Sequence, residues 1–318
     1  MVARITFFKV RDREKLIIRK PNSIRIEEGW KMLTDTASII LPRNVDYFDK
    51  FNVKAVFQSG DPVTIELGYN GNYVTEFTGY VKRVSAGIPI IIECEDEMYK
   101  IKKLPVHKSY RSIRLPNLLN EIVPGYQVDA LEIDLGALRF VKTNVGAVLE
   151  FLKQEYSLYS YMKYGQLVVG KIYQDDEVEP IQLHLEKNVV DNALNYKRKE
   201  DVIIKINAVS TLSDGSKIEV TVGDEDGENR QLSYYGIVSK EALKALADQD
   251  LKKYKVDGYD GFVEAFGIPQ IKHGNKVQVQ SGLYPDREGV YYVEEVITTF
   301  DDSPQYHREV KIGEKVTV

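Results

Sequence analysis

Over the first hundred residues, apolar and polar positions alternate in short runs that are separated by turn residues. Alternation with a period of two indicates strands with one buried face, and the Asn70-Gly71 pair between two such runs indicates a tight hairpin. The pattern predicts six strands, at residues 5–10, 23–26, 37–41, 62–69, 73–84 and 88–95. Six short strands in this length are typical of a small barrel or sandwich.

The periodicity becomes helical in the middle of the chain. One helix is predicted over 115–123, and a second over 145–156, which Thr143 or Asn144 can cap. A Tyr-rich hairpin follows at 156–173. This part of the chain is therefore predicted to be α+β.

Strand-like alternation then returns and continues to the end of the chain. The predicted strands of this part are 181–186, 193–197, 202–209, 217–222, 276–280, 289–299 and 307–313. One helix, capped by Ser239, interrupts them. The chain is thus predicted to have three domains, at 1–103, 104–188 and 189–318, the last with the inserted helix at 239–255.

The two β-rich parts share a motif. Gly60–Gly68 aligns without gaps on Gly274–Gly282, and Tyr80 matches Tyr292 after the turn, so the offset changes from 214 (274 − 60) to 212 (292 − 80). The match fits a duplicated β-domain, and it also fits two unrelated hairpins that share a short motif. A duplicated domain would give a trimer pseudo-six-fold symmetry, with which it could cap a hexameric ring.

Three stretches together resemble a known family. They are Gly60–Val84, followed by a strand that ends in Cys-Glu-Asp; Val145–Val169, a helix followed by a strand and G-x-L-x-V; and Ser239–Val296, which contains Phe266-Gly267-Ile-Pro269 and then Gly274-x-x-Val. The chain resembles phage tail baseplate hub proteins of the late control protein D family, and the N-terminal half of type VI secretion spike proteins. The resemblance covers nearly the whole chain in the right order.

The resemblance implies a β-rich α+β fold in which two tube-like β-barrel domains flank a smaller α+β domain. It also implies a homotrimer whose six barrels form a pseudo-six-fold ring. Such a hub would join the hexameric tail tube to the trimeric puncturing spike, contact other baseplate proteins, and reside in the virion tail after assembly in the cytoplasm of the bacterial host. Since the sequence ends at Lys315–Val318, directly after the second barrel, we expect the spike to be a separate polypeptide.

Two alternatives remain open from the sequence. In the first, the chain is the hub of a type VI-like or other phage-derived contractile injection system. In the second, it is a β-rich carbohydrate-binding module or hydrolase, whose site would be a cleft lined by aromatic side chains and paired carboxylates. No G-x-S-x-G elbow is present to support a hydrolase of the serine type. We expect a non-enzymatic structural protein of a phage or prophage tail.

Charge and composition narrow the choice of partners. The 318 residues include 43 Lys and Arg against 48 Asp and Glu, a net charge of −5. A dedicated nucleic-acid binder normally has a basic surface, so sequence-specific nucleic-acid binding is not expected. No stretch approaches the roughly 18 apolar, uncharged residues of a membrane-spanning helix, so direct membrane insertion is not expected either.

The sequence offers no catalytic, cofactor or metal site. The single Cys, Cys94, lies among Glu93, Glu95 and Asp96, whose charges oppose the thiolate that a nucleophile needs. The four histidines are far apart in the sequence, without the spacing of metal ligands: His107, His184, His273 and His307.

Two further segments match binding motifs only in part. Gly165–Lys171 has the glycines and the lysine of a P-loop, but Ile172 replaces the Ser or Thr that contacts Mg²⁺, and strand-forming residues fill the loop. Asp224–Asn229 resembles part of a Ca²⁺ loop, but strands flank it, and position twelve is Tyr235 instead of Glu. A hairpin strand and an acidic turn are the simpler interpretations.

Two segments are candidate contact surfaces. The run from Lys100 to Arg114 holds six basic residues and no acid, which fits either a solvated linker or a docking surface for an acidic neighbour. The Tyr-rich hairpin at 156–173 fits either a contact surface or ordinary packing, because Tyr combines a large apolar area with a polar tip.

Overall fold

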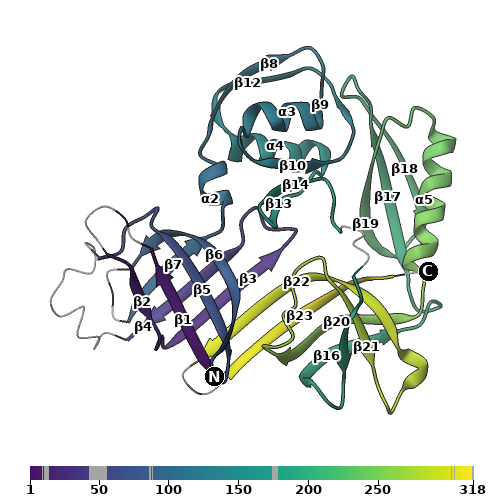
Figure 1. Cartoon of the computed structure of the whole chain (residues 1–318). Helices are drawn as coiled ribbons and strands as arrows, with labels where there is room; N and C mark the ends of the chain where they lie inside the picture. The colour runs from purple at the N-terminus through teal and green to yellow at the C-terminus, as the bar shows by residue number, and fades with distance from the viewer. Residues whose placement is uncertain are drawn as a thin grey trace.

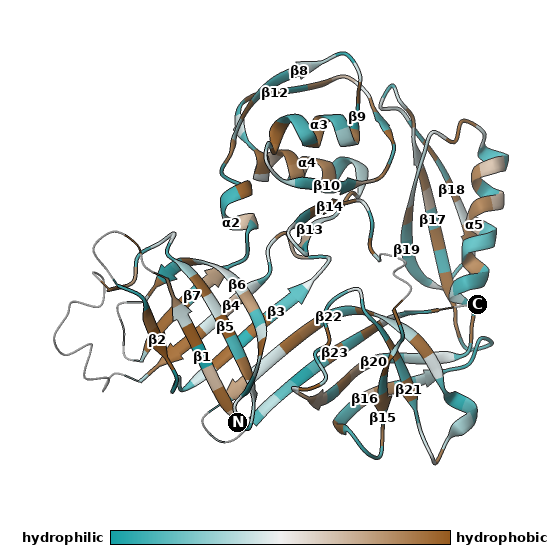
Figure 2. Cartoon of the chain, in the orientation of Figure 1, coloured by the Kyte–Doolittle hydropathy of each residue, from teal (hydrophilic) through white to brown (hydrophobic). Residues whose placement is uncertain are grey.

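The computed structural model describes residues 1–8, 10, 14–42, 56–85, 87, 89–173, 178–301, 303 and 305–316. They form two curled β-blocks, an α+β block drawn above them, and a small sheet covered by one helix (Figure 1). Hydrophobic and hydrophilic residues alternate along the strands, as expected for one core-facing side (Figure 2). The predicted strands 5–10 and 88–95, and the chain end at Lys315–Val318, include residues outside the described ones.

The first β-block comes from the alternating N-terminal sequence. Its strands are β1 (Val2–Phe7), β2 (Leu16–Ile18), β3 (Ser23–Gly29), β4 (Thr36–Leu41), β5 (Pro62–Tyr69), β6 (Asn72–Val84) and β7 (Ile90–Glu95). Asn70 and Gly71 form the predicted tight turn, with positive φ angles of 53° and 85°. Ile5, Ile39 and Ile65 are fully buried in the core of this block.

The middle block packs short strands around two longer helices. Its elements are α2 (Met98–Ile101), β8 (Pro105–Tyr110), β9 (Ile113–Arg114), α3 (Leu115–Ile122), β10 (Gln127–Ala130), β11 (Asp134–Leu135), β12 (Leu138–Asn144), α4 (Val145–Tyr156), β13 (Ser160–Lys163) and β14 (Gln166–Val169). The Asn144 side chain accepts a hydrogen bond from the Ala147 amide at 3.0 Å, so the predicted cap of α4 is confirmed. This block has its own hydrophobic core, including Leu118 and Leu149.

The second β-block carries an insertion with a separate core. The strands of the block are β15 (Ile181–His184), β16 (Val189–Lys197), β20 (Gly258–Phe266), β21 (Lys276–Gln280), β22 (Gly289–Asp301) and β23 (Gln305–Lys315), with a short 3₁₀ turn η1 (Pro285–Arg287). The insertion consists of β17 (Ile204–Thr211), β18 (Lys217–Gly223), β19 (Glu228–Tyr235) and α5 (Lys240–Tyr254). Ser239 caps α5 as predicted, and Leu243 and Ala247 pack onto the inserted sheet.

The two β-blocks share one continuous sheet. Its strand order is β16-β20-β23-β22-β3-β4-β7-β6-β5-β1-β2, with β21 and β15 attached to β22. The link is an antiparallel ladder between β22 and β3, from Glu295 opposite Gly29 to Asp301 opposite Ser23. This order does not return to its start, so the two tube-like barrels that we expected do not close within the described residues. The physical reason is that β22, with 13 residues, pairs with β21 and then continues along β3.

The internal repeat found in the sequence is also a repeat of geometry. The Gly60 amide donates to the Val81 carbonyl, and the Val81 amide donates to the Asp61 carbonyl. In the second block, the Gly274 amide donates to the Val293 carbonyl, and the Val293 amide donates to the Asn275 carbonyl. The side chains of Asp61 and Asn275 each accept a bond from the amide three residues earlier, and both glycines have positive φ. The sequence match is thus confirmed as a repeat of local geometry.

The repeat extends over six strands in each block. The order β3-β4-β7-β6-β5-β1 in the first block corresponds to β16-β20-β23-β22-β21-β15 in the second. One difference lies at the end of the series, because β1 runs antiparallel to β5 whereas β15 runs parallel to β21. The other is the insertion β17–α5, which takes the place of the short β3–β4 connection. The division at 103 and 188 stays a prediction.

Candidate functional site

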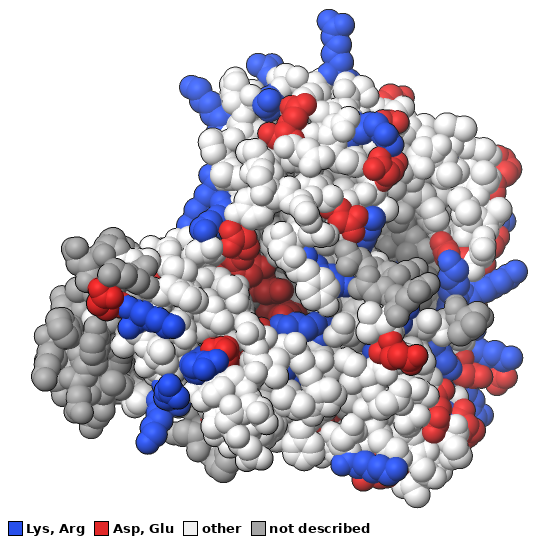
Figure 3. Space-filling view, viewed as in Figure 1, with Lys and Arg blue, Asp and Glu red and all other residues white. Residues whose placement is uncertain are grey.

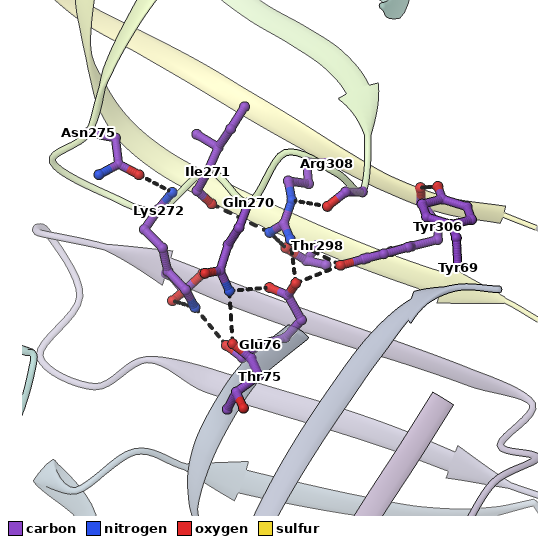
Figure 4. A network of polar contacts seen from close by, with 12 residues as sticks. Tyr69, Thr75, Glu76, Gln270, Ile271, Lys272, Asn275, Thr298, Tyr306 and Arg308 are labelled. Carbon is purple, nitrogen blue, oxygen red and sulfur yellow. Dashed lines mark hydrogen bonds and ion pairs between the residues drawn. The ribbon is translucent and has the colours of Figure 1, made fainter. Parts of the chain in front are cut away.

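A buried ion pair joins the two β-blocks. Arg308 of β23 and Glu76 of β6 are 0% and 2% exposed, and their side chains are 2.5 Å apart (Figure 4). The guanidinium also donates to Thr298 Oγ1 at 2.9 Å and to the Gly267 carbonyl at 2.8 Å. These charge-assisted bonds satisfy the buried guanidinium and offset part of the cost of removing it from water. We call Arg308, Glu76 and their bonded neighbours the inter-block clamp.

Tyrosines extend the clamp along the joint. The Tyr306 hydroxyl donates to Glu76 at 2.6 Å, and burial raises the pKa of Tyr306, so this hydroxyl keeps its proton. The Tyr69 hydroxyl, from the first block, donates to the Tyr306 carbonyl at 3.0 Å, and the two rings lie 5.3 Å apart. Each contact joins residues of the two β-blocks that are more than 200 positions apart in the sequence.

The loop between β20 and β21 supplies the other half of the clamp. Gln270 donates to the Thr75 carbonyl at 2.8 Å, and Lys272 donates to the Glu76 carbonyl and to Glu28 at 2.6 Å each (Figure 4). This loop is the Phe-Gly-x-Pro…Gly-x-x-Val motif that gave the sequence its most specific resemblance. The motif therefore has a structural task in this chain, which is to hold the two β-blocks together.

Acidic side chains gather where the clamp meets the middle block. They lie in the hollow beneath α2, between the two β-blocks (Figure 3). Burial raises the pKa of Glu28, although Lys272 opposes this effect. Burial and the charges of Glu28 and Asp96 raise the pKa of Asp35, and burial raises the pKa of Asp96 to about 7.

This carboxylate cluster predicts a stability that depends on pH. The folded pKa of Asp96 lies above its unfolded value, so its contribution is favourable at low pH and is lost as the pH rises toward 7. Asp96→Asn removes the charge and keeps an oxygen for the Met98 amide, which Oδ1 accepts at 3.0 Å. We compare the free energy of unfolding of the variant with that of the wild type. We expect this difference to favour the variant by about 2 kcal/mol more at pH 8 than at pH 5. Urea titrations at both pH values measure this difference, and an equal effect at both would contradict it.

The basic run from Lys100 to Arg114 is mostly neutralised within the chain. Lys102 donates to Glu95 at 2.5 Å, Lys108 lies 3.3 Å from Glu121, and Arg114 lies 2.7 Å from Glu132. Burial alone would raise the pKa of Glu95, but hydrogen bonds from Lys102 and Lys82 lower it. The solvated-linker interpretation is thus wrong for Lys102, whose partner Glu95 is 2% exposed.

Because of this pairing, charge reversal at Lys102 and at Arg111 should affect stability differently. Lys102→Glu places a second carboxylate beside buried Glu95, and we expect it to lower the free energy of unfolding by about 1–2 kcal/mol. Arg111→Glu changes an exposed residue, and we expect a change of less than about 0.5 kcal/mol. Chemical denaturation measures both variants. Only Arg111→Glu is therefore a clean probe of a docking surface, and equal losses of stability would contradict the assignment of Lys102.

The Tyr-rich hairpin 156–173 is largely an internal packing element. Tyr161 is 3% exposed and lies edge-on to His273, while Tyr159 lies edge-on to Trp30 of the first block. Tyr164, at the tip, is 79% exposed. The hairpin thus attaches the middle block to both β-blocks, and the packing interpretation holds for all but its tip.

The remaining candidate residues have structural partners. Lys171 of the P-loop-like segment bonds to Asp129, Asp224 of the acidic turn bonds to Lys255 at 2.6 Å, and Cys94 is 1% exposed, where burial raises the pKa of its thiol. Three histidines have polar neighbours: His107 lies beside Lys142, His184 beside Glu186 and His307 beside Glu264. The fourth, His273, packs against Tyr161. Within the described part of the chain, no three His, Cys, Asp or Glu side chains are placed to hold a metal ion.

One sizeable cleft lies between the second β-block and the insertion. It has a volume of about 710 Å³ and is lined by both aromatic and charged side chains. Two of the acids in its described lining have partners, since Glu294 lies 3.6 Å from both Lys31 and Lys311, and Glu314 accepts from Tyr254 at 2.8 Å. These two acids of the described lining are thus not a free pair of carboxylates of the kind that a glycosidase uses.

The charged side chains on the outer face of the shared sheet are mainly acidic. Residues opposite one another in the ladders share this face, from β16 through β22 and β3 to β6. The charged side chains on this face include the acids Asp191, Asp260, Glu264, Glu309, Glu295, Asp301, Glu27, Glu93 and Glu95, and the bases Lys197, Lys311, Arg25 and Arg83. This face continues across the joint between the two blocks without interruption.

The fold is that of phage tail proteins. A tail protein from Neisseria meningitidis matches with a TM-score of 0.65 over 99% of this chain and 96% of its own, at 12% sequence identity. A tail protein of the prophage MuSo2 from Shewanella oneidensis matches with a TM-score of 0.63 over 99% of this chain and 98% of its own, at 13% identity.

A third match extends the fold to secretion machinery. An E. coli component of the type VI secretion system matches with a TM-score of 0.55 over 93% of this chain and 73% of its own, at 9% identity. No protein-family model matches the chain, and no curated protein matches it in sequence. The resemblance to tail and secretion proteins that the sequence motifs indicated is confirmed at the level of the fold. In the described residues, no helix is long and apolar enough to span a membrane.

Proposed function

We propose that this chain is the structural hub of a phage or prophage tail baseplate. In this proposal it is a non-enzymatic homotrimer that joins the hexameric tail tube to a separate trimeric spike, and it resides in the virion tail with other baseplate proteins. The observation that carries the proposal is the six-strand repeat, which puts two equivalent β-blocks in one rigidly joined chain. Three such chains present six equivalent blocks, which is what a trimer needs to contact a six-fold partner.

The clamp and the shared ladder support this geometry. A pseudo-six-fold ring requires a fixed angle between the two blocks of each chain. The ladder between β22 and β3 and the buried pair of Arg308 and Glu76 fix that angle with backbone and charged hydrogen bonds. The two β-blocks would form the tube-like domains of the ring, and the middle block would brace them from outside.

The outer face of the sheet suits the wall of a channel. The acids that the ladders place on this face outnumber the bases and repel the DNA backbone, so a DNA molecule would pass without being held. The same face would suit a hub of a contractile injection system, which is the alternative within this class. Binding of the purified chain to duplex DNA, measured at low salt by fluorescence anisotropy, should be absent, and tight binding would contradict this role.

The two blocks differ at one hairpin tip, which supports a three-fold partner at one end. The β5–β6 tip is the polar pair Asn70-Gly71, whereas the β21–β22 loop presents Leu283, which is 74% exposed. Ser281 holds that loop by accepting from the Leu283 amide at 3.2 Å and by donating to Glu186 at 2.6 Å. In the proposed ring, the six equivalent hairpin tips of three chains would all lie at the same end of the ring. The apolar β21–β22 tips would then alternate with the polar β5–β6 tips.

This alternation predicts where the spike binds. Leu283→Asp should weaken binding of the spike protein roughly tenfold or more and leave binding of the tube protein unchanged, because only the three apolar tips are lost. Asn70→Asp is the matched control at the other tip and should leave spike binding unchanged. Biolayer interferometry with the two partner proteins of the same phage measures both. Equal loss of tube and spike binding by Leu283→Asp would contradict this assignment.

A carbohydrate-binding role is the candidate from a different class. The 710 Å³ cleft is the feature that favours it, because Trp30 and Tyr254 lie in its lining. Against it, the lining residues Tyr259 and Tyr291 are 9% and 1% exposed, so they offer no face for a sugar ring to stack on. A glycan array tests it directly, and we expect no binding.

A further inference from the structure

Several strand edges of the large sheet have no partner among the described residues, including those of β2, β15, β16 and the end of β6. β16 is the last strand at one end of the sheet and pairs only with β20. β6 pairs with β5 on one side as far as Tyr80, and from Arg83 onward it pairs only with β7 on the other side. Open edges expose backbone amides and carbonyls, which are available to a further strand.

The repeat shows what the open edge of β6 corresponds to. β22, its counterpart, pairs with β21 as far as Tyr292 and then pairs with β3 from Glu295 onward. Both strands have an irregularity at the change of partner, between Val81 and Arg83 in β6 and between Val293 and Glu295 in β22. The open part of β6 therefore corresponds to the part of β22 that holds β3.

The open edge of β16 corresponds to the other half of the same joint. The ladders place Ile26 of β3 opposite Ala37, which is opposite Cys94, which is opposite Val81. In the second block they place Leu194 of β16 opposite Gly261, then Ile312, then Val293. Ile26 and Leu194 are thus equivalent, and β16 corresponds to the strand that β22 holds.

Burial along the two equivalent strands differs in the way that a missing neighbour predicts. In β3, Ile24 and Ile26 are 1% and 0% exposed and Glu28 is 7% exposed. Their counterparts in β16 are Asn192, which is exposed, and Leu194 and Tyr196, which are only half-buried. On the other edge, Val84 is half-buried, whereas its counterpart Val296 is fully buried. Each open edge thus has apolar side chains that a paired strand would cover.

We propose that β16 of one copy of this chain pairs antiparallel with the C-terminal end of β6 in a neighbouring copy. The joint within the chain sets the register, because it pairs Glu295 with Gly29. In the repeat, Arg83 is equivalent to Glu295 and Lys197 is equivalent to Gly29, so Arg83 would lie opposite Lys197. Val84 then faces Tyr196, and Ser85 faces Asn195. This inference rests on the proposed trimer, in which three joints within chains alternate with three between chains and no open edge of this kind remains.

The charges near the new joint balance. Arg83 bonds to Glu93 within the first block, at 2.5 and 3.1 Å, and Lys197 bonds to Asp260 within the second block, at 2.8 Å. Bringing Arg83 and Lys197 together therefore brings two ion pairs side by side, with two positive and two negative charges. Like charges opposite each other in a ladder would otherwise oppose pairing.

A disulfide between neighbouring copies tests the register. Directly opposite residues of an antiparallel pair have Cα atoms about 4.5–5.5 Å apart, within the range that a disulfide spans. The variant Arg83→Cys/Lys197→Cys replaces two exposed side chains. Cys94 is 1% exposed and does not compete. Under a mild oxidant, the variant should convert from single chains to covalent trimers on a non-reducing gel, with roughly tenfold more product than the control.

The control displaces one cysteine along β16. Arg83→Cys/Val190→Cys moves it by seven residues, roughly 23 Å along the strand, and Val190 is itself 44% exposed. The solution mass of each variant before oxidation distinguishes the two proposals. A trimer that does not cross-link through 83 and 197, or that cross-links equally through 83 and 190, overturns the strand pairing and leaves the hub. A single-chain mass without cross-linking overturns both.

Discussion

Replacing Arg308 with methionine should lower the free energy of unfolding by about 3–5 kcal/mol. The variant leaves the Glu76 carboxylate buried without its cation, and it also removes the bonds to Thr298 and to the Gly267 carbonyl. An uncompensated buried charge costs more than the lost bonds alone. Urea denaturation followed by circular dichroism measures the loss.

The matched control is the double variant Arg308→Met/Glu76→Met. It removes both charges, so no buried ion remains unpaired, and we expect it to recover most of the stability that Arg308→Met loses. A loss below about 1 kcal/mol for Arg308→Met would mean that the pair is not buried as described. Equal losses for the single and the double variant would show that the unpaired carboxylate is not the cause.

Gly267→Ala should be the other severe variant, with a loss of about 3 kcal/mol or more. A Cβ at Gly267 would clash with the ring of Tyr306, which is 0% exposed and whose hydroxyl is bonded to Glu76. The carbonyl of Gly267 accepts from Arg308, so any shift of the loop also weakens the clamp. Thermal and urea unfolding measure the effect.

Gly87→Ala is the matched control for this variant. A Cβ at Gly87 would meet no atom of the described residues within 4 Å, and the residue is exposed. We expect a change within about 0.5 kcal/mol. Similar stability of the Gly267 and Gly87 variants would contradict the close approach of Gly267 to Tyr306, and with it the structural task assigned to the Phe-Gly motif.

The sequence predicted the elements that depend on local signals. The helices α3, α4 and α5 lie where the periodicity placed them, because capping residues such as Asn144 and Ser239 and apolar spacing act within a few residues. The tight turn at Asn70-Gly71 was predictable for the same reason. Strands β19 and β20 were missed, because β19 is mostly polar on an exposed sheet and Gly258 and Gly261 interrupt β20.

Contacts between distant segments were beyond local reasoning. Nothing near Glu76 or Arg308 in the sequence indicates that they meet, since they are 232 residues apart. The pairing of β22 with β3 is equally non-local, and it produced one open sheet where the resemblance implied two barrels. The Phe-Gly-x-Pro motif did mark the right segment, but only the structure shows that it holds Thr75 and Glu76.

The same limit applies to the surfaces. The basic run looked like one feature in the sequence, but Lys102 turns toward buried Glu95 while Arg111 stays exposed. The repeat was the exception, because its short motif was visible in the sequence and its bonds were then confirmed in both copies. It is the feature from which the proposed ring and the proposed strand pairing both follow.

The most direct test of that ring is the solution mass of the purified chain by light scattering, followed by electron-microscope class averages. The account predicts a mass three times the 36.4 kDa of one chain, and a ring with a central hole and six similar lobes. A mass of one or two chains at all accessible concentrations, or a particle without the six similar lobes, would contradict it.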